Sequence, residues 1–121
     1  MNTTSGKFPH HRLDAYRVSV EMACAAKTLA DRVPRGYRSF ADQLLRAAGG
    51  TVLLIAEGAN RYTAGQKRQR FSEARGECGE AATAAELLAA LGLVPAQDAQ
   101  LVVDLAARVA AMLTRLIARH S

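Results

Sequence analysis

The fold of this chain is most clearly indicated by the stretch Arg46-Ala-Ala-Gly-Gly-Thr-Val-Leu-Leu-Ile-Ala-Glu57-Gly58-Ala-Asn-Arg61. Its central run from Ala47 to Ala56 carries no charge. At about 100° per residue, Arg46, Gly50 and Glu57 share one narrow strip of a helix, and apolar side chains cover most of the remaining circumference. A surface helix of a small protein needs an apolar stripe only a little over ~100° wide. This helix therefore needs neighbours on two sides, which predicts a helical bundle that also forms an oligomer.

The composition indicates a single domain that is helical nearly throughout. The chain has 121 residues, half of them hydrophobic, with 5% aromatic residues and three prolines. That length suffices for one buried core, and the long stretches rich in Ala, Leu, Arg and Glu favour helix. The apolar run is far shorter than the roughly 20 residues that span a bilayer, and Met1–Lys7 lacks an apolar signal core. We therefore predict a cytoplasmic protein that is not inserted in a membrane.

Apolar periodicity predicts four helices with short connections. Their expected bounds are Leu13–Val33, Ser39–Glu57, Lys67–Leu91 and Pro95–Arg119. Ser39 would cap the second helix, Gly58 would end it, and residues 59–66 would form a loop. Such helices predict an all-α, antiparallel up-down-up-down four-helix bundle over residues 13–121, preceded by a flexible N-terminal arm over residues 1–12.

Two of these helices carry regular apolar seams. On the third helix the seam consists of Phe71, Ala74, Cys78, Ala81, Ala85 and Leu88. On the fourth helix the seam is predicted to be Val102, Leu105, Val109, Met112 and Leu116. Gly49 and Gly50, inside the second helix, each cost about 1 kcal/mol relative to Ala. They therefore indicate a close approach to another helix or a kink.

The sequence contains no pattern typical of a catalytic or metal site. Cys24 and Cys78 fall inside helical patterns, and we expect both in the core, because buried cysteine usually acts as a small hydrophobe. His10, His11 and His120 lie near the chain ends and are expected to be solvated. The chain has no Glu-x-x-His pair for a di-metal bundle, no glycine-rich phosphate loop and no nucleophile elbow. We therefore predict no enzymatic activity, no cofactor and no metal.

Positive charge is the main functional signal. The chain has a net charge of +5, with 16 Lys and Arg residues. Most of these are Arg, which makes planar, bidentate contacts to phosphate. The candidate nucleic-acid contacts are Arg61, Lys67, Arg68 and Arg70. The alternative interpretation is that these cations are ordinary solvated side chains at helix ends and in loops. Arg35 and Arg38 flank the opposite end of the second helix, so larger basic surfaces would have to arise by oligomerisation.

The third helix also carries an acidic ridge, formed by Glu73, Glu77 and Glu80. Residues 61–75 have a net charge of +4 and residues 76–98 a net charge of −4. A head-to-tail ring would match such unlike faces, with the ridge meeting Arg46 or Arg75 of a neighbouring copy. The alternative is a solvated acidic face.

Several motifs occur at spacings that are similar to a known family. They are Leu13-Asp-Ala-Tyr16, Leu45-Arg-Ala-Ala48, Ile55-Ala-Glu-Gly58 with Arg61, Phe71-x-x-Ala-Arg-Gly76, and Leu91-Gly-Leu93. From Leu13 to Val94 the chain resembles the small four helix bundle proteins encoded in intervening sequences of bacterial large-subunit ribosomal RNA genes. Related proteins are the accessory variability determinants of diversity-generating retroelements.

The resemblance implies a homopentameric barrel without catalytic activity. In the retroelement branch it implies a basic surface for RNA or DNA and a reverse transcriptase as partner. The candidate bundle or subunit contacts are Arg46, Leu53, Glu57, Arg75, Glu77 and Glu80. One segment departs from the family: Thr51-Val-Leu-Leu54 replaces a common Ile-Pro-Ser-Asn, and the missing proline should leave the second helix straighter.

Two functional hypotheses follow from these residues and this resemblance. The first is an oligomeric bundle that binds nucleic acid electrostatically, as an accessory to an enzyme such as a reverse transcriptase. The alternative is a protein-interaction scaffold whose charges serve only assembly.

Overall fold

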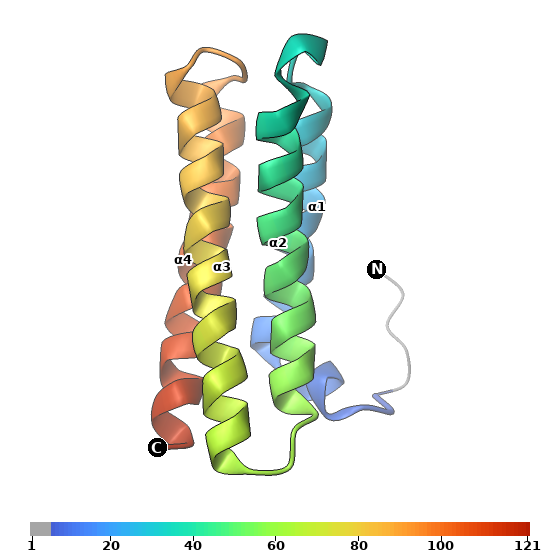
Figure 1. The fold of residues 1–121 in the computed structure, drawn as a ribbon, viewed down its shortest axis with the longest axis vertical. Coiled ribbons are helices and arrows are strands. Elements are labelled where there is room, and N and C mark those ends of the chain that lie inside the picture. Colours follow the sequence, from blue (N-terminus) through green and yellow to red (C-terminus); the bar gives the residue numbers. More distant parts are fainter. Residues whose placement is uncertain (1–5) are drawn as a thin grey trace.

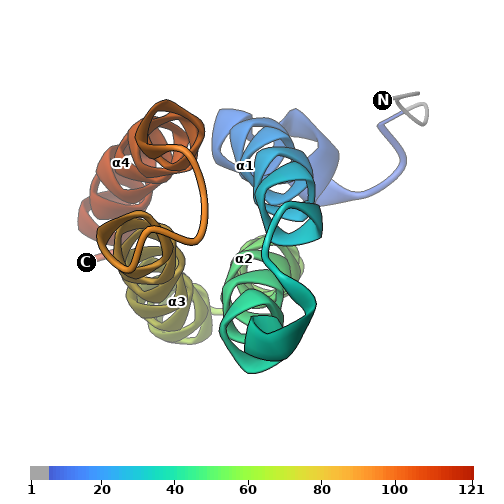
Figure 2. The same ribbon diagram turned by 90° about the horizontal axis from the view of Figure 1, so that it is seen from above.

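The computed structural model describes residues 6–121 as four long helices and two short 3₁₀ helices, with no strand in that range. The elements are η1 (Pro9–Arg12), α1 (Asp14–Asp31), η2 (Arg35–Tyr37), α2 (Arg38–Ala59), α3 (Ala64–Ala90) and α4 (Ala96–Arg119). The helices alternate up and down (Figure 1). Seen from above, each packs beside its neighbours in the chain, α4 closes against α1, and α1 and α3 lie diagonally opposite (Figure 2). The predicted all-α four-helix bundle is confirmed.

The turns are tighter than the sequence predicted. The loop expected over residues 59–66 shrinks to the segment Asn60–Thr63, because the Thr63 hydroxyl accepts a hydrogen bond from the Gln66 backbone N–H at 3.1 Å and caps α3. At the other end of α3, Gly92 has φ +75°, a left-handed conformation that glycine adopts without strain and that lets the chain turn towards α4. Pro95 occupies the N-cap of α4, one position before the predicted first turn.

Both predicted ends of the second helix are wrong. The helix starts directly after η2, so Ser39 lies inside it and no side chain caps it. At its far end, Gly58 is buried within the helix, and Asn60 is the C-cap. A Cβ atom at Gly58 would lie 2.8 Å from the Phe71 ring. Gly58 is therefore required for the close packing of α2 on α3, and it does not terminate the helix.

The core confirms the seam predicted for α3, since all six of its residues are buried. On α4 the prediction is partly wrong: Leu105 and Met112 are only half-buried, and Ala106 and Leu113 take their places. The buried seam therefore keeps the predicted alternation of three- and four-residue steps, but in the reverse order: it runs through Val102, Ala106, Val109, Leu113 and Leu116. Two polar residues, Ser19 and Thr51, are fully buried and bond carbonyls of their own helices, Tyr16 O at 2.7 Å and Ala47 O at 2.8 Å.

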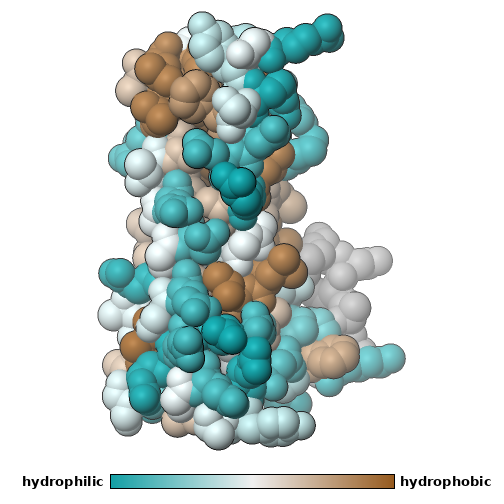
Figure 3. All heavy atoms as spheres, in the orientation of Figure 1, coloured by the Kyte–Doolittle hydropathy of each residue, from teal (hydrophilic) through white to brown (hydrophobic). Residues whose placement is uncertain are grey.

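Residues 51–54, where the sequence differs from the family pattern, lie partly in the core and partly at the surface. Thr51 is completely buried, whereas the Leu53 side chain is 71% exposed. Leu53 and Val52 line an apolar hollow between α1 and α2, together with Val20, Ala23, Cys24, Lys27 and Gly49. Apolar atoms accordingly reach the surface midway along α2 (Figure 3). The second apolar face predicted for this helix therefore exists and is uncovered in the single chain.

Among residues 6–121, no helix is both long and apolar enough to cross a membrane.

Candidate nucleic-acid interface

The topology gathers most of the positive charge at one end of the bundle. This end contains η1, the start of α1, the α2–α3 turn and the end of α4 (Figure 1). We define the cationic end as residues 6–22, 49–76 and 108–121, which carry eleven Lys and Arg residues against four Asp and Glu. The remaining halves of the helices, residues 23–48 and 77–107, carry five cations against seven acids. The net positive charge of the chain thus belongs to one end.

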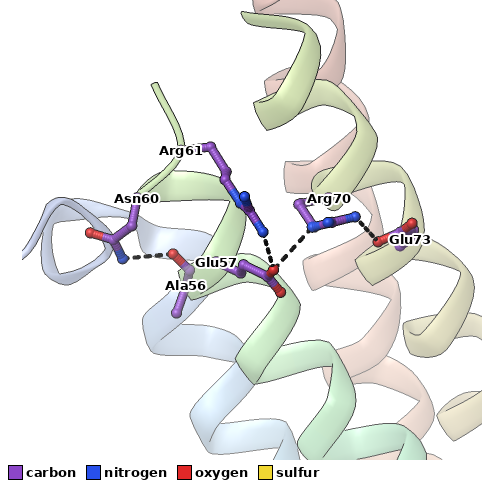
Figure 4. A network of polar contacts seen from close by, with 6 residues as sticks. All are labelled: Ala56, Glu57, Asn60, Arg61, Arg70 and Glu73. Atoms are coloured by element: carbon purple, nitrogen blue, oxygen red, sulfur yellow. Dashed lines mark hydrogen bonds and ion pairs between the residues drawn. The ribbon is translucent and has the colours of Figure 1, made fainter. Parts of the chain in front are cut away.

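Two of the four predicted contacts, Arg61 and Arg70, share the carboxylate of Glu57 (Figure 4). Arg61 Nη2 donates to Glu57 Oε1 at 2.6 Å, and Arg70 Nε donates to the same oxygen at 3.1 Å. Arg70 Nη1 also donates to Glu73 at 2.9 Å. The hydrogen bond from Arg61 is the largest cause that lowers the pKa of Glu57, and the bond to Glu73 raises the pKa of Arg70. These two cations are therefore partly neutralised inside the monomer.

The other two, Lys67 and Arg68, bond to backbone carbonyls at the ends of neighbouring helices. Lys67 Nζ donates to Ala59 O at 2.8 Å, in the last turn of α2. Arg68 Nη1 donates to His120 O, at the end of α4. Helix C-termini carry unpaired carbonyls and partial negative charge, which cations stabilise. Because both acceptors are uncharged, Lys67 and Arg68 still add full positive charge to the cationic end.

The predicted subunit contacts find neighbours within the same chain. Glu57 belongs to the network just described, and Arg75 Nε donates to Thr114 Oγ1 of α4 at 2.8 Å. Arg46, Glu80 and Leu87 line a shallow groove between α2 and α3. Leu53 is the one member of the set that faces an apolar, uncovered surface.

The acidic ridge is not uniformly solvated. Glu73 bonds Arg70, whereas Glu77 is half-buried between α2 and α3. A Cβ atom at Gly50 would lie 2.8 Å from Glu77 Oε1, so this glycine makes room for the carboxylate. Burial, followed by the nearby Glu80, raises the pKa of Glu77, and the charge of Arg46 opposes that shift. Gly50 therefore agrees with the predicted close approach of this helix to another one. At Gly49, in contrast, a Cβ atom would meet nothing within 4 Å.

The histidines are not solvated as predicted. All three are half-buried. His10 Nδ1 lies 2.9 Å from Asn60 Nδ2, which also donates to Ala56 O at 2.7 Å. The amide nitrogen is thus the donor in both contacts, and His10 Nδ1 accepts. This contact ties η1, part of the predicted arm, to the end of α2, while residues 1–5 of that arm lie outside the described residues.

The two cysteines differ. Cys78 is buried, as predicted, and its thiol donates to Ala106 O at 3.1 Å. Burial raises the pKa of Cys78 to about 11. Cys24 is exposed beside the apolar hollow, so the prediction of a core position for it is wrong.

Sequence reasoning missed three cations that the fold brings together, Arg12, Arg115 and Arg119. A weak signal was present, because Arg115 and Arg119 stand four residues apart and so share a face of the helix. Their proximity to Arg12 depends on the closure of α4 against α1, which no local pattern contains. Among residues 6–121, no group of three or more His, Cys, Asp or Glu side chains could hold a metal ion.

Comparison with known proteins identifies one family. A family model described as 23S rRNA-intervening sequence protein matches residues 11–115. A search of curated proteins finds no significant match.

Proposed function

Because the chain belongs to the 23S rRNA-intervening sequence protein family, we propose that it is a non-catalytic helical bundle that binds nucleic acid through its cationic end. The observation that supports this proposal is the segregation of charge. The cationic end has eleven Lys and Arg residues against four Asp and Glu, whereas the rest of the bundle has five against seven. A field of this kind attracts polyanions and raises their local concentration.

The chemistry of the cationic end favours the phosphate backbone over the bases. Arginine predominates there, and its planar group matches the geometry of phosphate oxygens. Contacts to phosphate position a protein on nucleic acid and carry no sequence information. Lys67 and Arg68, whose partners are uncharged carbonyls, contribute more to this field than Arg61 and Arg70, which share acids.

The test is the salt dependence of binding. Anisotropy of a labelled single-stranded RNA and of a duplex DNA is measured over a range of NaCl concentrations. The proposal predicts that log K falls linearly with log salt, with a slope of about −0.7 per phosphate contact for the single strand and about −0.9 for the duplex. Absent binding, or binding indifferent to salt, contradicts it.

We further propose that the chain assembles through the apolar hollow on α1 and α2 into a homo-oligomer, a pentamer by resemblance to its family. The support is the exposure of Leu53 at 71% in the single chain, since large apolar side chains grouped on a surface mark interaction sites. A closed ring would place several cationic ends side by side and multiply their contacts with one nucleic acid. Such an assembly, located in the cytoplasm, suits an accessory of a reverse transcriptase.

The rival function is a protein-interaction scaffold. The observation in its favour is that all four cations predicted from the sequence have partners within the monomer. The rival predicts that Arg46→Glu or Glu77→Arg breaks the oligomer, while reversing the charges of Arg68 and Arg70 leaves nucleic-acid binding unchanged. The proposed function predicts weaker binding after that reversal.

A further inference from the structure

We propose that the cleft between the start of α1 and the end of α4 is the phosphate-binding site of the cationic end; this inference rests on the proposed function. The cleft has a volume of about 210 Å³. Its charged lining residues are Arg12, Arg115, Arg119 and Asp14. The ligand that this lining fits is one phosphodiester group of a nucleic-acid backbone.

Three elements bring the arginines together. Arg12 is the last residue of η1, and Leu13 and Asp14 follow it into the first turn of α1. Arg115 and Arg119 occupy the last two turns of α4, one helical turn apart. Because α4 closes the bundle against α1 (Figure 2), residues of its last two turns line one cleft with the start of α1. Arginines from both walls therefore line the cleft.

These arginines differ from the four predicted from the sequence in having no protein partner. Within residues 6–121, none of the three forms an ion pair or hydrogen bond through its side chain. All three are exposed. By contrast, Arg61 and Arg70 are held by acids, and Lys67 and Arg68 by helix carbonyls. A phosphate entering the cleft would thus displace no existing contact of these arginines.

The single acid of the cleft does not cancel the site. Asp14 accepts a hydrogen bond from Arg17 Nη2 at 2.9 Å, so its charge is already balanced by a cation. The remaining lining consists of apolar residues, namely Leu13, Ala15, Met112 and Leu116. Three uncompensated positive charges against an apolar wall favour a compact anion.

The geometry also selects the kind of anion. Arg115 and Arg119, one turn apart, can each offer paired N–H donors, and Arg12 adds a third guanidinium group from η1. A tetrahedral phosphate accepts from several directions at once, whereas a carboxylate offers one planar edge. Contacts from these arginines to phosphate carry no sequence information, so binding in the cleft should not depend on base sequence.

The experiment compares two double variants that lose equal charge. Arg115→Gln/Arg119→Gln removes the α4 side of the cleft, and Arg35→Gln/Arg38→Gln removes two exposed cations from the other half of the bundle. Both are measured by anisotropy with a mixed-sequence single-stranded RNA and with a polyglutamate chain as competitor. Circular dichroism and thermal unfolding establish that both variants are folded.

Loss of two phosphate contacts should weaken RNA binding about 25-fold at roughly 0.1 M salt and flatten the salt slope by about 1.4. The Arg35/Arg38 variant should bind within about threefold of the wild type, since its charges are distant and screened. Adding Arg12→Gln to the cleft variant should weaken binding further.

If both double variants bind RNA equally weakly, the cleft is not the phosphate-binding site, although the protein still binds nucleic acid electrostatically. Competition by polyglutamate as effective as that by RNA would overturn the phosphate assignment. If the wild type binds neither RNA nor DNA, the proposed function is wrong, and so is the assignment of the cleft as a phosphate-binding site.

Discussion

At the scale of single residues, small side chains determine how closely the helices pack. Gly58 was predicted to end the second helix because glycine commonly follows a helix C-terminus. The structure places it inside α2 against Phe71, a long-range contact that the local sequence does not contain. The buried seam of α3, in contrast, was predicted correctly, because its periodicity lies entirely within one helix.

A methyl group at Gly58 should therefore destabilise the protein. Gly58→Ala places a Cβ atom 2.8 Å from the Phe71 ring, and overpacking of this kind costs about 1–3 kcal/mol. Gly76 is the matched control, since a Cβ there meets nothing within 4 Å and Gly→Ala in a helix gains up to about 1 kcal/mol. Urea unfolding should show opposite signs for the two variants. Stabilisation by Gly58→Ala would contradict the packing described.

The two thiols should react very differently in the native protein. Cys24 is exposed, whereas Cys78 is buried with a pKa raised to about 11, so little of it is thiolate at neutral pH. In a Leu53→Asp variant, in which the hollow around Cys24 stays uncovered, iodoacetamide should modify Cys24 alone under native conditions and both cysteines in denaturant, as read by mass spectrometry. A Cys24→Ser variant provides the control, and rapid native modification of that variant would show that the core is open at Cys78.

At the scale of elements, polar side chains fasten the helix ends at the cationic end. Lys67 and Arg68 reach from the first turn of α3 to the ends of α2 and α4. The sequence revealed these cations but not their acceptors, because a carbonyl's position depends on how other helices end. The same reason explains His10, which was expected in solvent and instead accepts from Asn60. Helix type and order were predictable from local pattern, and contacts between helix ends were not.

The stability of this end should fall on mild acidification. Burial, with a contribution from His11, lowers the pKa of His10 from 6.5, and burial with Lys67, Arg119 and Arg68 lowers that of His120. A histidine with a lowered folded pKa binds its proton more readily when unfolded. Its contribution to stability is therefore present above pH 6.5 and lost as pH falls through 6.5 towards the folded pKa. For His10 the neutral ring is also required to accept from Asn60, while Tyr16 and His11 pack against it.

Urea unfolding at about pH 7.5 and about pH 5.5 measures this effect. The wild type should lose more stability over that interval than the His10→Gln/His120→Gln variant. Glu77 acts in the opposite direction, since its raised pKa favours the folded state on acidification, but it is common to both proteins and cancels in the comparison. An identical pH dependence in the two proteins would contradict the role given to the histidines.

At the scale of the whole molecule, the bundle has two surfaces that are suited to contact with another molecule and that its own helices do not cover. One is the apolar hollow around Leu53, and the other is the cationic end. The breadth of the apolar run in the second helix predicted the first surface directly. The second could not be located from sequence, because it combines segments from η1, α3 and α4 that meet only when α4 closes against α1. The four cations predicted from the sequence lie at the cationic end, where each donates to a neighbouring residue.

Charge at the hollow should break the oligomer. Leu53→Asp places a carboxylate in the apolar face, whereas Leu101→Asp changes a leucine that is 54% exposed on α4, outside the hollow. Light scattering after size exclusion should give the wild type and Leu101→Asp a mass about five times the chain's 12.9 kDa. Leu53→Asp should reduce that mass to 12.9 kDa without loss of helix. A wild-type monomer, or a Leu53→Asp variant of unchanged mass, would contradict assembly through this face.

Arginine footprinting would locate the nucleic-acid contacts on the protein surface, because it reports the accessibility of each arginine side chain in the intact protein. Phenylglyoxal modification is compared with and without single-stranded RNA and read by mass spectrometry. We expect RNA to protect Arg12, Arg115 and Arg119 strongly and to leave Arg35 and Arg46 as reactive as before. Protection of Arg35 and Arg46 instead, or no protection at any arginine under conditions of low salt, would contradict nucleic-acid binding through the cationic end.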